Sequence, residues 1–313
     1  MRKCLCCYQP LEEEVFEYHS KCSKALFETS TPPQLDLNQD EVEGLALEII
    51  KKKIAVTGVQ AKMSLSLAKT KASLPSKLTI VGLWGNYILK LPSAIYSELP
   101  EVEAITMQMA KLAKIAVVPH GLIRLTSGEL CYITRRIDRL KGNNLHMEDM
   151  CQLADKLTEY KYQGSYEQVA TLIRQYSSNP GLDTVNFAEQ ILFCFLTGNS
   201  DMHLKNFSIL QEGGNSFNLS PAYDMVATVL VHPSDKEDLA LNLNGRKKRL
   251  KLRDFHSAFS TMKLTEVQQN NIISKMVAAK NTWFSCIESS FLSHEKKDAY
   301  QQLLEDRFKR LNL

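Results

Sequence analysis

The sequence has 313 residues, which exceeds the usual size of one domain. Hydrophobic residues make up 44% of it, which is ample for a core. Lysine and arginine (38) barely outnumber aspartate and glutamate (35), so the net charge of +3 gives no general case for nucleic-acid binding. No apolar run reaches the roughly 18 to 20 residues of a membrane span, and the N-terminus, MRKCLCCYQPLEEE, lacks the apolar stretch of a signal peptide. We therefore expect a cytoplasmic globular protein with two lobes or two domains.

The first 28 residues are predicted to form a Cys/His-rich cap. Two pairs of ligand-type residues, each with two residues between its members, occur here: Cys4 with Cys7, and His19 with Cys22. Such pairs can meet around one tetrahedral Zn²⁺, because each turns tightly enough to aim both donors inward. A metal would also explain how a segment too small for a core folds, and it would leave Cys6 as a spare. The alternative is a small capping element with reduced cysteines.

A linker and a β-rich region follow. TSTPPQLDL at 29–37 has the composition of an extended linker, and QDEVEGLALEIIKKK at 39–53 predicts a short amphipathic helix, so 29–53 is assigned as linker and helix. Over 54–140, VTGVQAKMSLSLA alternates around a glycine turn, and LTIVG, NYILKLP, VPHGLIRL and LCYITRRID predict strands. One helix is predicted among them, at 98–117.

The remaining residues, 141–313, have a mostly helical pattern. MEDMCQLADKL, SYEQVATLIRQYS, VNFAEQILFCFLTGN and the chain from about 254 onward predict helices. FSILQEGGNSFNLSPAYD predicts a β-hairpin with Gly213 and Gly214 at its turn. GRKKRLKLR at 245–253 indicates a solvated surface segment, with a phosphate-binding patch as the alternative. A β-rich N-lobe thus precedes a mostly helical C-lobe, which makes the fold class α+β.

The stretch GNSDMHLKN carries the strongest indication of chemistry. Gly198 is predicted to end a buried helix, so Asp201 would lie on a rigidly supported loop, where a carboxylate can be held close to a reacting hydroxyl. Asn206 offers a neutral oxygen ligand, and Asp224 in PAYDM offers an anionic one. With phosphate oxygens, these ligands suit a hard cation of the magnesium type, and Lys205 can balance phosphate charge.

The N-lobe supplies a complementary lysine. Lys90 in YILKLP is placed within a strand, where an inward-pointing ammonium is unfavourable unless it meets a carboxylate or a phosphate. Glu101 or Glu103 on the next helix could be its partner. TGVQAKMS at 57–64 adds a glycine, backbone amides and Lys62, which could cradle phosphate. Together these are the parts that phosphoryl transfer requires.

Each of these residues also has a simpler interpretation when it is taken alone. Asp201 could be a helix or turn cap, His203 a polar surface residue, Lys90 an edge residue that reaches toward solvent, and Asp224 a turn acid. Their joint occurrence in this order favours a site.

At these residues the sequence resembles the HipA-like serine/threonine protein kinases, the toxin component of bacterial hip toxin–antitoxin modules. The matching pieces occur in family order: TGVQAKMSL, YILKLP, ELPEVEAITMQMA, RRIDR, MEDMCQL, GNSDMHLKNFS and SPAYDM. DxHxKN followed by YD is typical of this family, whereas kinases at large use HRD and DFG. The resemblance covers roughly 54–311 and implies a bilobed protein-kinase-like (HipA-like) fold that uses ATP and Mg²⁺.

The resemblance also implies roles for individual residues. Asp201 would be the catalytic acid that orients the substrate hydroxyl, Asn206 and Asp224 the magnesium ligands, and Lys90 the lysine that binds ATP phosphate. The other residues of the implied ATP site are Thr57, Gly58, Val59, Gln60, Lys62, Arg135, Arg136, Ile137, His203, Lys205 and Tyr223. The family can have glutamate at the position of Arg135, so adenine is expected to meet the backbone there.

The sequence departs from the family pattern in two places. HipA carries an N-terminal domain before its kinase lobes, whereas this chain has only the cap and linker, so it resembles the short HipT form. The resemblance therefore implies a HipB-like helix-turn-helix antitoxin and a small HipS-like protein as partners, with DNA bound only through the antitoxin and no membrane partner. The regulatory autophosphorylation serine of the family is absent, because the two candidate positions hold Ala55 and Thr57; Thr57 is the candidate.

The function implied is an ATP- and magnesium-dependent serine/threonine protein kinase that acts as the toxin of a toxin–antitoxin module. Its implied substrate is an aminoacyl-tRNA synthetase, whose phosphorylation would arrest translation and growth. Two alternatives remain open: a small-molecule kinase, and a catalytically weak nucleotide-binding subunit of a repressor complex.

Overall fold

The computed structural model describes residues 2–11, 16–35, 60, 62–68, 76–81, 85–140, 143–211 and 213–313. The predicted helix at 39–53, together with Thr57, Gly58 and Val59, lies outside the described residues. The chain divides into two compact units, and the division falls within the helix α3 (Leu99–Leu112). Unit 1 comprises Met1–Ala104, Val118–Ile137 and Ser289–Phe291; unit 2 comprises Ile105–Val117, Asp138–Glu288 and Leu292–Leu313.

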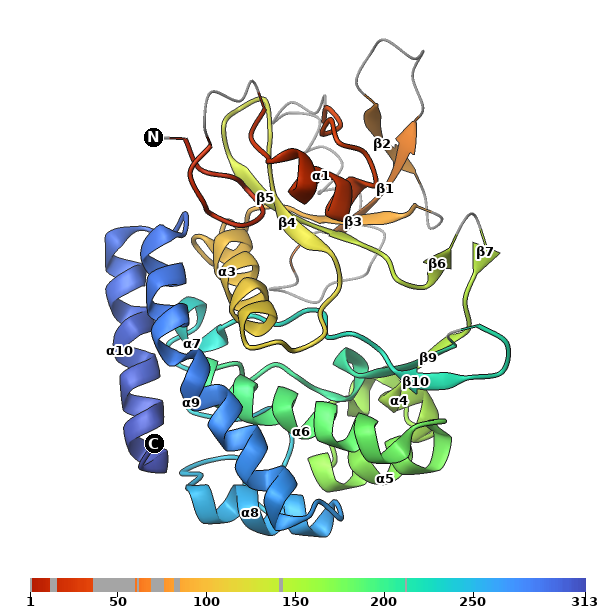
Figure 1. Ribbon diagram of the computed structural model, residues 1–313, viewed down its shortest axis with the longest axis vertical. Helices are drawn as coiled ribbons and strands as arrows, with labels where there is room; N and C mark the ends of the chain where they lie inside the picture. The colour runs from red at the N-terminus through yellow and green to blue at the C-terminus, as the bar shows by residue number, and fades with distance from the viewer. Residues whose placement is uncertain are drawn as a thin grey trace. The chain divides into compact units, whose positions relative to one another are not determined.

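Unit 1 is built on a five-stranded antiparallel sheet (Figure 1). In chain order its strands are β1 (Lys62–Ala68), β2 (Lys77–Val81), β3 (Tyr87–Lys90), β4 (His120–Arg124) and β5 (Leu130–Arg135). They are arranged in the order β2-β1-β3-β5-β4. In β1 the alternating pattern buries Met63 and Leu65 while the serines between them stay partly exposed, as a half-buried strand requires. The strands predicted in this region are confirmed.

The central strand β3 ends at Lys90. The register places Lys90 opposite Lys62 of β1 on one side and opposite Tyr132 of β5 on the other. Only 4% of Lys90 is exposed. The interpretation of Lys90 as an edge residue that reaches toward solvent is therefore wrong, since the strand is central and the side chain is buried.

The N-terminal cap packs against the outer edge of β4. Its helix α1 (Ser20–Phe27) buries Phe27, whose ring centroid lies 5.9 Å from that of Tyr87. The backbone N–H of Leu122 in β4 donates to the carbonyl of Leu5 at 3.0 Å, and the Tyr18 hydroxyl donates to the carbonyl of Leu122. The cap thus satisfies backbone groups that an uncovered sheet edge would expose.

Unit 2 is mostly helical. After α3 its α-helices are α4 (Met150–Leu153), α5 (Tyr166–Tyr176), α6 (Pro180–Thr197), α7 (Thr228–Val231), α8 (Leu252–Thr261), α9 (Glu266–Ser289) and α10 (His294–Leu311). Two 3-10 turns, η1 (Thr158–Tyr160) and η2 (Leu204–Asn206), lie between them. The predicted helix at 98–117 is shorter than expected, because Lys114 adopts a left-handed conformation (φ 59°) that an α-helix cannot continue through.

The helix α6 forms the centre of unit 2 and supports the loop that follows it. Every residue from Phe187 to Thr197 is buried, as the apolar run FAEQILFCFLT predicts. Phe193 packs edge-on against Trp283, whose indole N–H donates to the carbonyl of Met109 at 2.8 Å. Gly198 then ends the helix with φ 69°, which confirms the predicted C-cap.

Short strands flank the helices of unit 2. β8 (Met147–Asp149), β9 (Ser208–Gln211) and β10 (Phe217–Leu219) form a three-stranded sheet, and β6 (Arg139–Leu140) pairs with β7 (Asn143–Asn144). The predicted hairpin is confirmed as β9 and β10, with Gly213 and Gly214 both at positive φ. The helix predicted from MEDMCQLADKL is largely wrong: Met147–Asp149 pairs with β9, and the Asp149 side chain caps a helix of only four residues.

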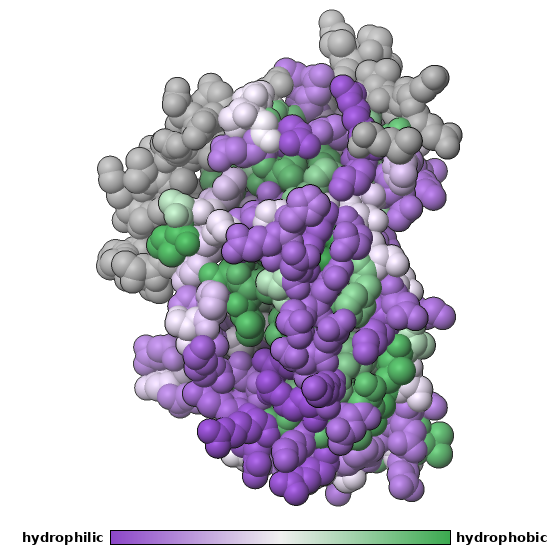
Figure 2. Space-filling view, turned by 90° about the vertical axis from the view of Figure 1, so that its left-hand side faces the viewer, coloured by the Kyte–Doolittle hydropathy of each residue, from purple (hydrophilic) through white to green (hydrophobic). Residues whose placement is uncertain are grey.

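The last features of the fold concern the protein surface, namely the basic segment 245–253 and the polarity of the helices. The basic segment 245–253 leads into α8, and two of its side chains face acids: Arg246 Nε lies 3.9 Å from Asp254, and Lys247 Nζ lies 3.6 Å from Glu237. Within the described residues, no helix combines the length and apolar character needed to cross a membrane. Figure 2 shows a largely hydrophilic face, in keeping with the polar sequence of α10.

Candidate active site

The loop after α6 is folded around Asp201. The N–H of Asp201 donates to Asn199 Oδ1 at 3.1 Å. Its carbonyl accepts from the N–H of His203 at 2.8 Å and from Asn206 Nδ2 at 3.1 Å. The backbone is therefore fixed on both sides of Asp201, which leaves the carboxylate as the part of the residue that can act on a substrate.

The amide of Asn206 is oriented by the same hydrogen bond. Because Nδ2 donates to the carbonyl of Asp201, Oδ1 is directed elsewhere and is the atom that could bind a hard cation. Asn206 is only 7% exposed, so its side chain is also fixed by packing. This geometry suits the magnesium-ligand role that the sequence implied.

Tyr162 holds the carboxylate of Asp201, and sequence reasoning did not find it. Its hydroxyl donates to Asp201 Oδ1 at 2.5 Å, and its ring packs edge-on against His203 with centroids 4.9 Å apart. Burial, and then the negative charge of Asp201, raise the pKa of Tyr162, so the hydroxyl stays protonated and acts as a donor. Tyr162 lies 39 residues before Asp201 in an irregular segment, so no local pattern indicates the contact.

His203 is buried rather than a polar surface residue. It is 6% exposed, and its Nδ1 has no hydrogen-bond partner among the residues that the structure describes. Burial lowers the pKa of His203, against the opposing effect of the Asp201 charge and a smaller one of Asp224. The imidazole is therefore held neutral, and its buried, unsatisfied nitrogen is what a bound polar ligand would be expected to satisfy.

The segment with Tyr223 and Asp224 is tied to the loop after α6. The Tyr223 hydroxyl lies 2.5 Å from Ser208 Oγ and donates to the carbonyl of Lys205 at 3.2 Å. Burial raises the pKa of Tyr223, which keeps it a neutral hydrogen-bonding group. Asp224 follows in a left-handed conformation, φ 55°, of the strained kind that often occurs at functional sites.

Lys205 forms an ion pair in the same region. Its Nζ lies 2.6 Å from Asp149 Oδ2, and its side chain is 33% exposed. Asp149 was not predicted as a partner, because it lies 56 residues away at the end of β8. The partial exposure leaves the ammonium accessible to a second anion such as a phosphate.

Unit 1 contains the other predicted nucleotide residues. Lys90 forms a buried ion pair with Glu103, one of the two predicted partners. The ammonium of Lys90 also lies 5.2 Å from the ring centroid of Tyr132. Both charged groups are almost completely buried, with the side chains 5% and 3% exposed, so their positions are fixed.

The other predicted residues of unit 1 that the structure describes lie at or next to the ends of strands β1 and β5. Gln60 Nε2 donates to the carbonyl of Leu91 at 2.6 Å, and Lys62 begins β1 opposite Lys90. At the end of β5, Arg135 makes an ion pair of 2.7 Å with Glu28 of the cap. The guanidinium of Arg135 is thus engaged by the cap. Arg136 and Ile137 follow directly, and the N–H of Arg136 donates to the carbonyl of Asn86 at 2.8 Å.

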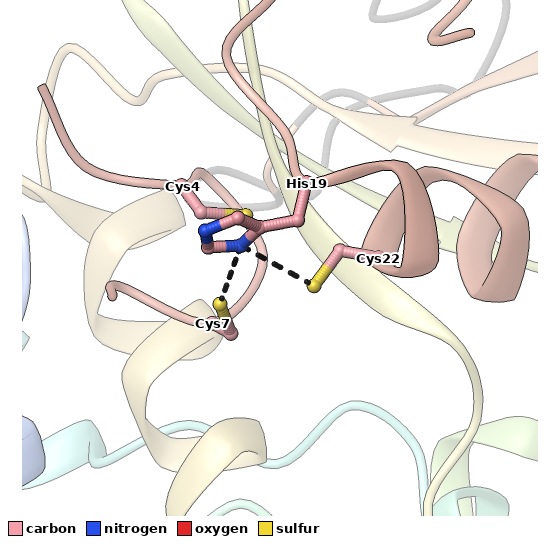
Figure 3. Close-up of side chains that lie close together, drawn as sticks. All are labelled: Cys4, Cys7, His19 and Cys22. Carbon is pink, nitrogen blue, oxygen red and sulfur yellow. Dashed lines mark hydrogen bonds between the residues drawn. The ribbon is translucent and has the colours of Figure 1, made fainter. Parts of the chain in front are cut away.

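The four predicted zinc ligands converge in the cap. The donor atoms of Cys4, Cys7, His19 and Cys22 all lie within 4.8 Å of one another, and Figure 3 shows their side chains directed toward a common point.

The donors of unit 2 fit a magnesium-bound nucleotide. The amide oxygen of Asn206 and the carboxylate of Asp224 are hard oxygen ligands of the type that Mg²⁺ takes beside phosphate. The unsatisfied Nδ1 of His203 and the partly exposed side chain of Lys205 supply further polar groups for such a ligand. In unit 1, Lys90 and Glu103 form a buried lysine–glutamate ion pair, a feature that protein kinases also contain.

Comparison with protein families gives a direct assignment. The model of the HipA-like C-terminal domain matches residues 54–283, which is well over half of the chain. The chain belongs to the HipA-like C-terminal domain family. The sequence-based resemblance to HipA-like proteins is confirmed by this match.

Two curated relatives of this HipA-like chain bear kinase names. The Sinorhizobium fredii protein named “Putative kinase Y4dM” is 30% identical over 208 residues, which cover 63% of this chain and 50% of that protein. A Haemophilus influenzae protein named “Putative kinase” is 28% identical over 186 residues, which cover 56% and 52%. The chain thus spans about half the length of the curated relatives that it matches.

Two solved structures share the fold. HipA of Shewanella oneidensis MR-1, solved with HipB and its operator DNA, superposes with a TM-score of 0.68 at 18% identity, over 83% of this chain and 65% of that one. The proinflammatory kinase CtkA of Helicobacter pylori superposes with a TM-score of 0.56 at 12% identity, over 80% of this chain and 93% of that one. These likenesses confirm the predicted α+β, HipA-like fold, with an antiparallel sheet in the N-terminal part and helices in the C-terminal part.

Proposed function

We propose that this chain is an ATP- and magnesium-dependent serine/threonine protein kinase. The observation that carries the proposal is the state of Asp201: its backbone is fixed by Asn199, His203 and Asn206, and its carboxylate is held by the neutral hydroxyl of Tyr162. A carboxylate in this state is oriented, which is what a group that positions a substrate hydroxyl needs.

In the proposed reaction Asp201 accepts the proton of the substrate hydroxyl as its oxygen bonds to the γ-phosphorus of ATP. The bond from that phosphorus to the β,γ-bridging oxygen breaks, and ADP leaves. Asn206 Oδ1 and the Asp224 carboxylate would hold Mg²⁺, which neutralises phosphate charge when bound. Lys90 and Lys205 would bind phosphate oxygens. Lys90 is kept in place by Glu103, whereas Lys205 can turn from Asp149 toward the nucleotide.

We further propose that the kinase acts as the toxin of a type II toxin–antitoxin module, paired with a HipB-like antitoxin and a small HipS-like protein. The support is membership of the HipA-like family and the likeness to Shewanella HipA, which was solved with HipB and operator DNA. By family resemblance the substrate would be an aminoacyl-tRNA synthetase, and Thr57 would be the candidate for autophosphorylation. Phosphopeptide mass spectrometry after incubation with ATP locates the modified residue.

The test of the activity is a transfer assay with labelled ATP and magnesium. Purified wild type and Asp201→Asn are incubated alone and with a bacterial lysate, and proteins are separated on a gel. We expect a labelled lysate protein with the wild type and a rate lower by about 10²- to 10⁴-fold with Asp201→Asn, while nucleotide binding persists. Label on small metabolites alone would indicate a small-molecule kinase, and nucleotide binding without any transfer would indicate a nucleotide-binding subunit of a repressor complex.

The metal role has its own matched control. Asp224→Asn should raise the magnesium concentration needed for half-maximal activity and weaken magnesium–ATP binding. Asp155 also adopts a left-handed conformation, φ 52° against φ 55° for Asp224, and it is exposed and outside the site. Asp155→Asn therefore makes the same substitution at the same backbone conformation without removing a proposed metal ligand. If Asp224→Asn and Asp155→Asn required the same magnesium concentration for half-maximal activity, Asp224 would not be a magnesium ligand.

A further inference from the structure

The N-terminal cap contains a cluster of sulfur and imidazole donors that phosphoryl transfer does not use. We propose that Cys4, Cys7, His19 and Cys22 bind one structural Zn²⁺ ion that fastens the cap to the edge of the sheet in unit 1. This inference is independent of the proposed kinase activity, because it rests on the geometry of the cap alone.

The spacing of the donor atoms is close to that of a tetrahedral site. His19 Nδ1 lies 3.4 Å from Cys7 Sγ and 4.0 Å from Cys22 Sγ, and all four donor atoms lie within 4.8 Å of one another (Figure 3). Zinc bonds of ~2.3 Å to sulfur and ~2.0 Å to nitrogen, at tetrahedral angles, separate the donors by about 3.5 to 3.8 Å. The donors therefore need to move little to surround one ion.

The tautomer of His19 leaves the correct nitrogen for a metal. Nε2 lies 3.0 Å from the carbonyl of Pro10, and because a carbonyl can only accept, Nε2 carries the proton. Nδ1, which faces the sulfurs, is then the unprotonated nitrogen. A ligating histidine that donates its other N–H to a backbone carbonyl is the usual arrangement in zinc sites.

The backbone of the first ligand pair is shaped to aim both thiols one way. Cys4 N–H donates to the carbonyl of Gln9, and the N–H of Tyr8 donates to the carbonyl of Cys4, both at 2.9 Å. Tyr8 adopts φ 64°, which is uncommon for an aromatic residue and closes the turn directly after Cys7. The turn thus contains a strained residue directly after the proposed ligand Cys7, where a bound metal would stabilise the turn.

The second pair lies at the start of α1. His19 is the N-cap residue, and the N–H of Cys22 donates to the carbonyl of His19 at 2.9 Å. One ion would therefore join the turn at Cys4 and Cys7 to the first turn of a helix, two segments that are too short to form a core by themselves.

The joined segments are those that cover β4. Leu5, next to Cys4, accepts from the N–H of Leu122, and Tyr18, next to His19, donates to the carbonyl of Leu122. Glu17 pairs with Arg124 at 2.8 Å. The cap lies close to Gly121 of β4, since a Cβ there would lie 3.2 Å from Leu26 Cδ2 and 3.5 Å from the carbonyl oxygen of Leu5. Zinc would hold this closely fitted cap on an otherwise open sheet edge.

The first experiment measures the metal content of the full chain, purified without a polyhistidine tag, by inductively coupled plasma mass spectrometry. We expect one zinc per chain in the wild type and loss of most of it in Cys22→Ser. Cys6→Ser is the matched control: Cys6 is a buried neighbour whose thiol donates to the carbonyl of His120 at 3.4 Å, a contact that serine can keep. Its zinc content should equal that of the wild type.

Exchanging the ligand type tests the coordination itself. His19→Ala should lose the metal, whereas His19→Cys should retain it, because four thiolates also form a structural zinc site. Replacement of zinc by Co²⁺ should give the visible absorption of a tetrahedral centre with thiolate charge-transfer bands in the near ultraviolet, stronger in His19→Cys than in the wild type.

Hydrogen exchange in β4 of the wild type tests the proposal even where a variant folds poorly. Removing zinc from the wild type with a chelator should speed hydrogen exchange at the amide of Leu122 and leave that of α6 unchanged. The proposal would be overturned if the wild type held no metal and either all four side chains reacted with chemical modifiers or two of the cysteines formed a disulfide. Equal zinc loss in Cys6→Ser and Cys22→Ser would also overturn it. None of these results depends on phosphoryl transfer, so failure of the zinc site and failure of the kinase proposal are distinguishable.

Discussion

Unit 1 and unit 2 each hold their own charged candidate residues, and they do so by different means. In unit 1, Lys90 and Glu103 neutralise each other in a buried ion pair, with side chains 5% and 3% exposed. In unit 2, Asp201 is held by the neutral hydroxyl of Tyr162, and Lys205 pairs with Asp149 where a third of the lysine side chain is exposed.

This difference separates charges that are fixed from charges that can exchange partners. A buried ion pair is strongly destabilised when one partner is removed, because the remaining charge cannot return to water. A partly exposed pair contributes little, because water and a ligand can replace either partner. Lys90 of unit 1 is thus a fixed charge, whereas Lys205 of unit 2 can exchange its partner for a phosphate.

The largest expected effect on stability comes from Glu103→Gln. This change removes the carboxylate that compensates the buried ammonium of Lys90, so we expect the free energy of unfolding to fall by about 3 to 5 kcal/mol. Chemical denaturation monitored by circular dichroism measures the loss.

A double variant separates the structural role of this pair from its proposed chemical role. Lys90→Met combined with Glu103→Leu removes both charges and keeps apolar volume, which is often neutral for stability. The double variant should therefore be more stable than Glu103→Gln yet remain inactive in phosphoryl transfer. An active double variant would show that Lys90 does not bind the nucleotide.

Sequence reasoning succeeded where a residue's surroundings are local. Gly198 at the end of an apolar helix, the Gly213–Gly214 turn and the paired spacing of the cysteines with His19 all predicted what the structure contains. Lys90 was also placed correctly in a strand, and its partner was narrowed to two glutamates on the next helix.

It failed where the partner comes from a distant part of the chain. Tyr162 and Asp149 reach Asp201 and Lys205 across 39 and 56 residues, and neither lies in a periodic segment that indicates which way its side chain points. Met147–Asp149 was mistaken for the start of a helix because its strand character comes from pairing with β9, not from its own three residues.

Tyr162→Phe tests the hydrogen bond from the neutral Tyr162 hydroxyl to the carboxylate of Asp201. The variant keeps the ring that packs on His203 but removes the hydrogen bond to the carboxylate, which is worth about 1.5 to 3 kcal/mol for a charged acceptor. We expect kcat to fall roughly 10- to 100-fold with an unchanged KM for ATP. Tyr160→Phe, on the same segment and exposed, should match the wild type. A higher KM with unchanged kcat would place Tyr162 in nucleotide binding instead.

A smaller effect should appear in the pH dependence of stability through His203. Burial lowers its pKa in the folded state below the ordinary value of about 6.5, so the unfolded chain binds more protons between these two pKa values. Stability is therefore full above pH ~6.5 and is lost as the pH falls through this window, by at most about 1.4 kcal/mol per pH unit.

Comparison of variants isolates this contribution. His203→Gln should flatten the slope of unfolding free energy against pH, whereas His294→Gln, at an exposed histidine, should leave it unchanged. Nuclear magnetic resonance should show a neutral His203 ring at pH 6.5. A protonated ring at that pH would mean that the charges of Asp201 and Asp224 outweigh burial.

The smallest expected effect is that of Asp149→Asn, and it is the direct counterpart of Glu103→Gln. Asparagine keeps an oxygen that can accept from the N–H of Gln152 and so preserves the cap of α4, while the charge opposite Lys205 is removed. Because the pair is partly exposed, the free energy of unfolding should fall by less than about 1 kcal/mol. Asp149→Ala, which removes the cap as well, should lose about 1 kcal/mol more. If Asp149→Asn destabilised the protein as much as Glu103→Gln, the Lys205 pair would be as fixed as the Lys90 pair, and Lys205 could not turn toward a phosphate.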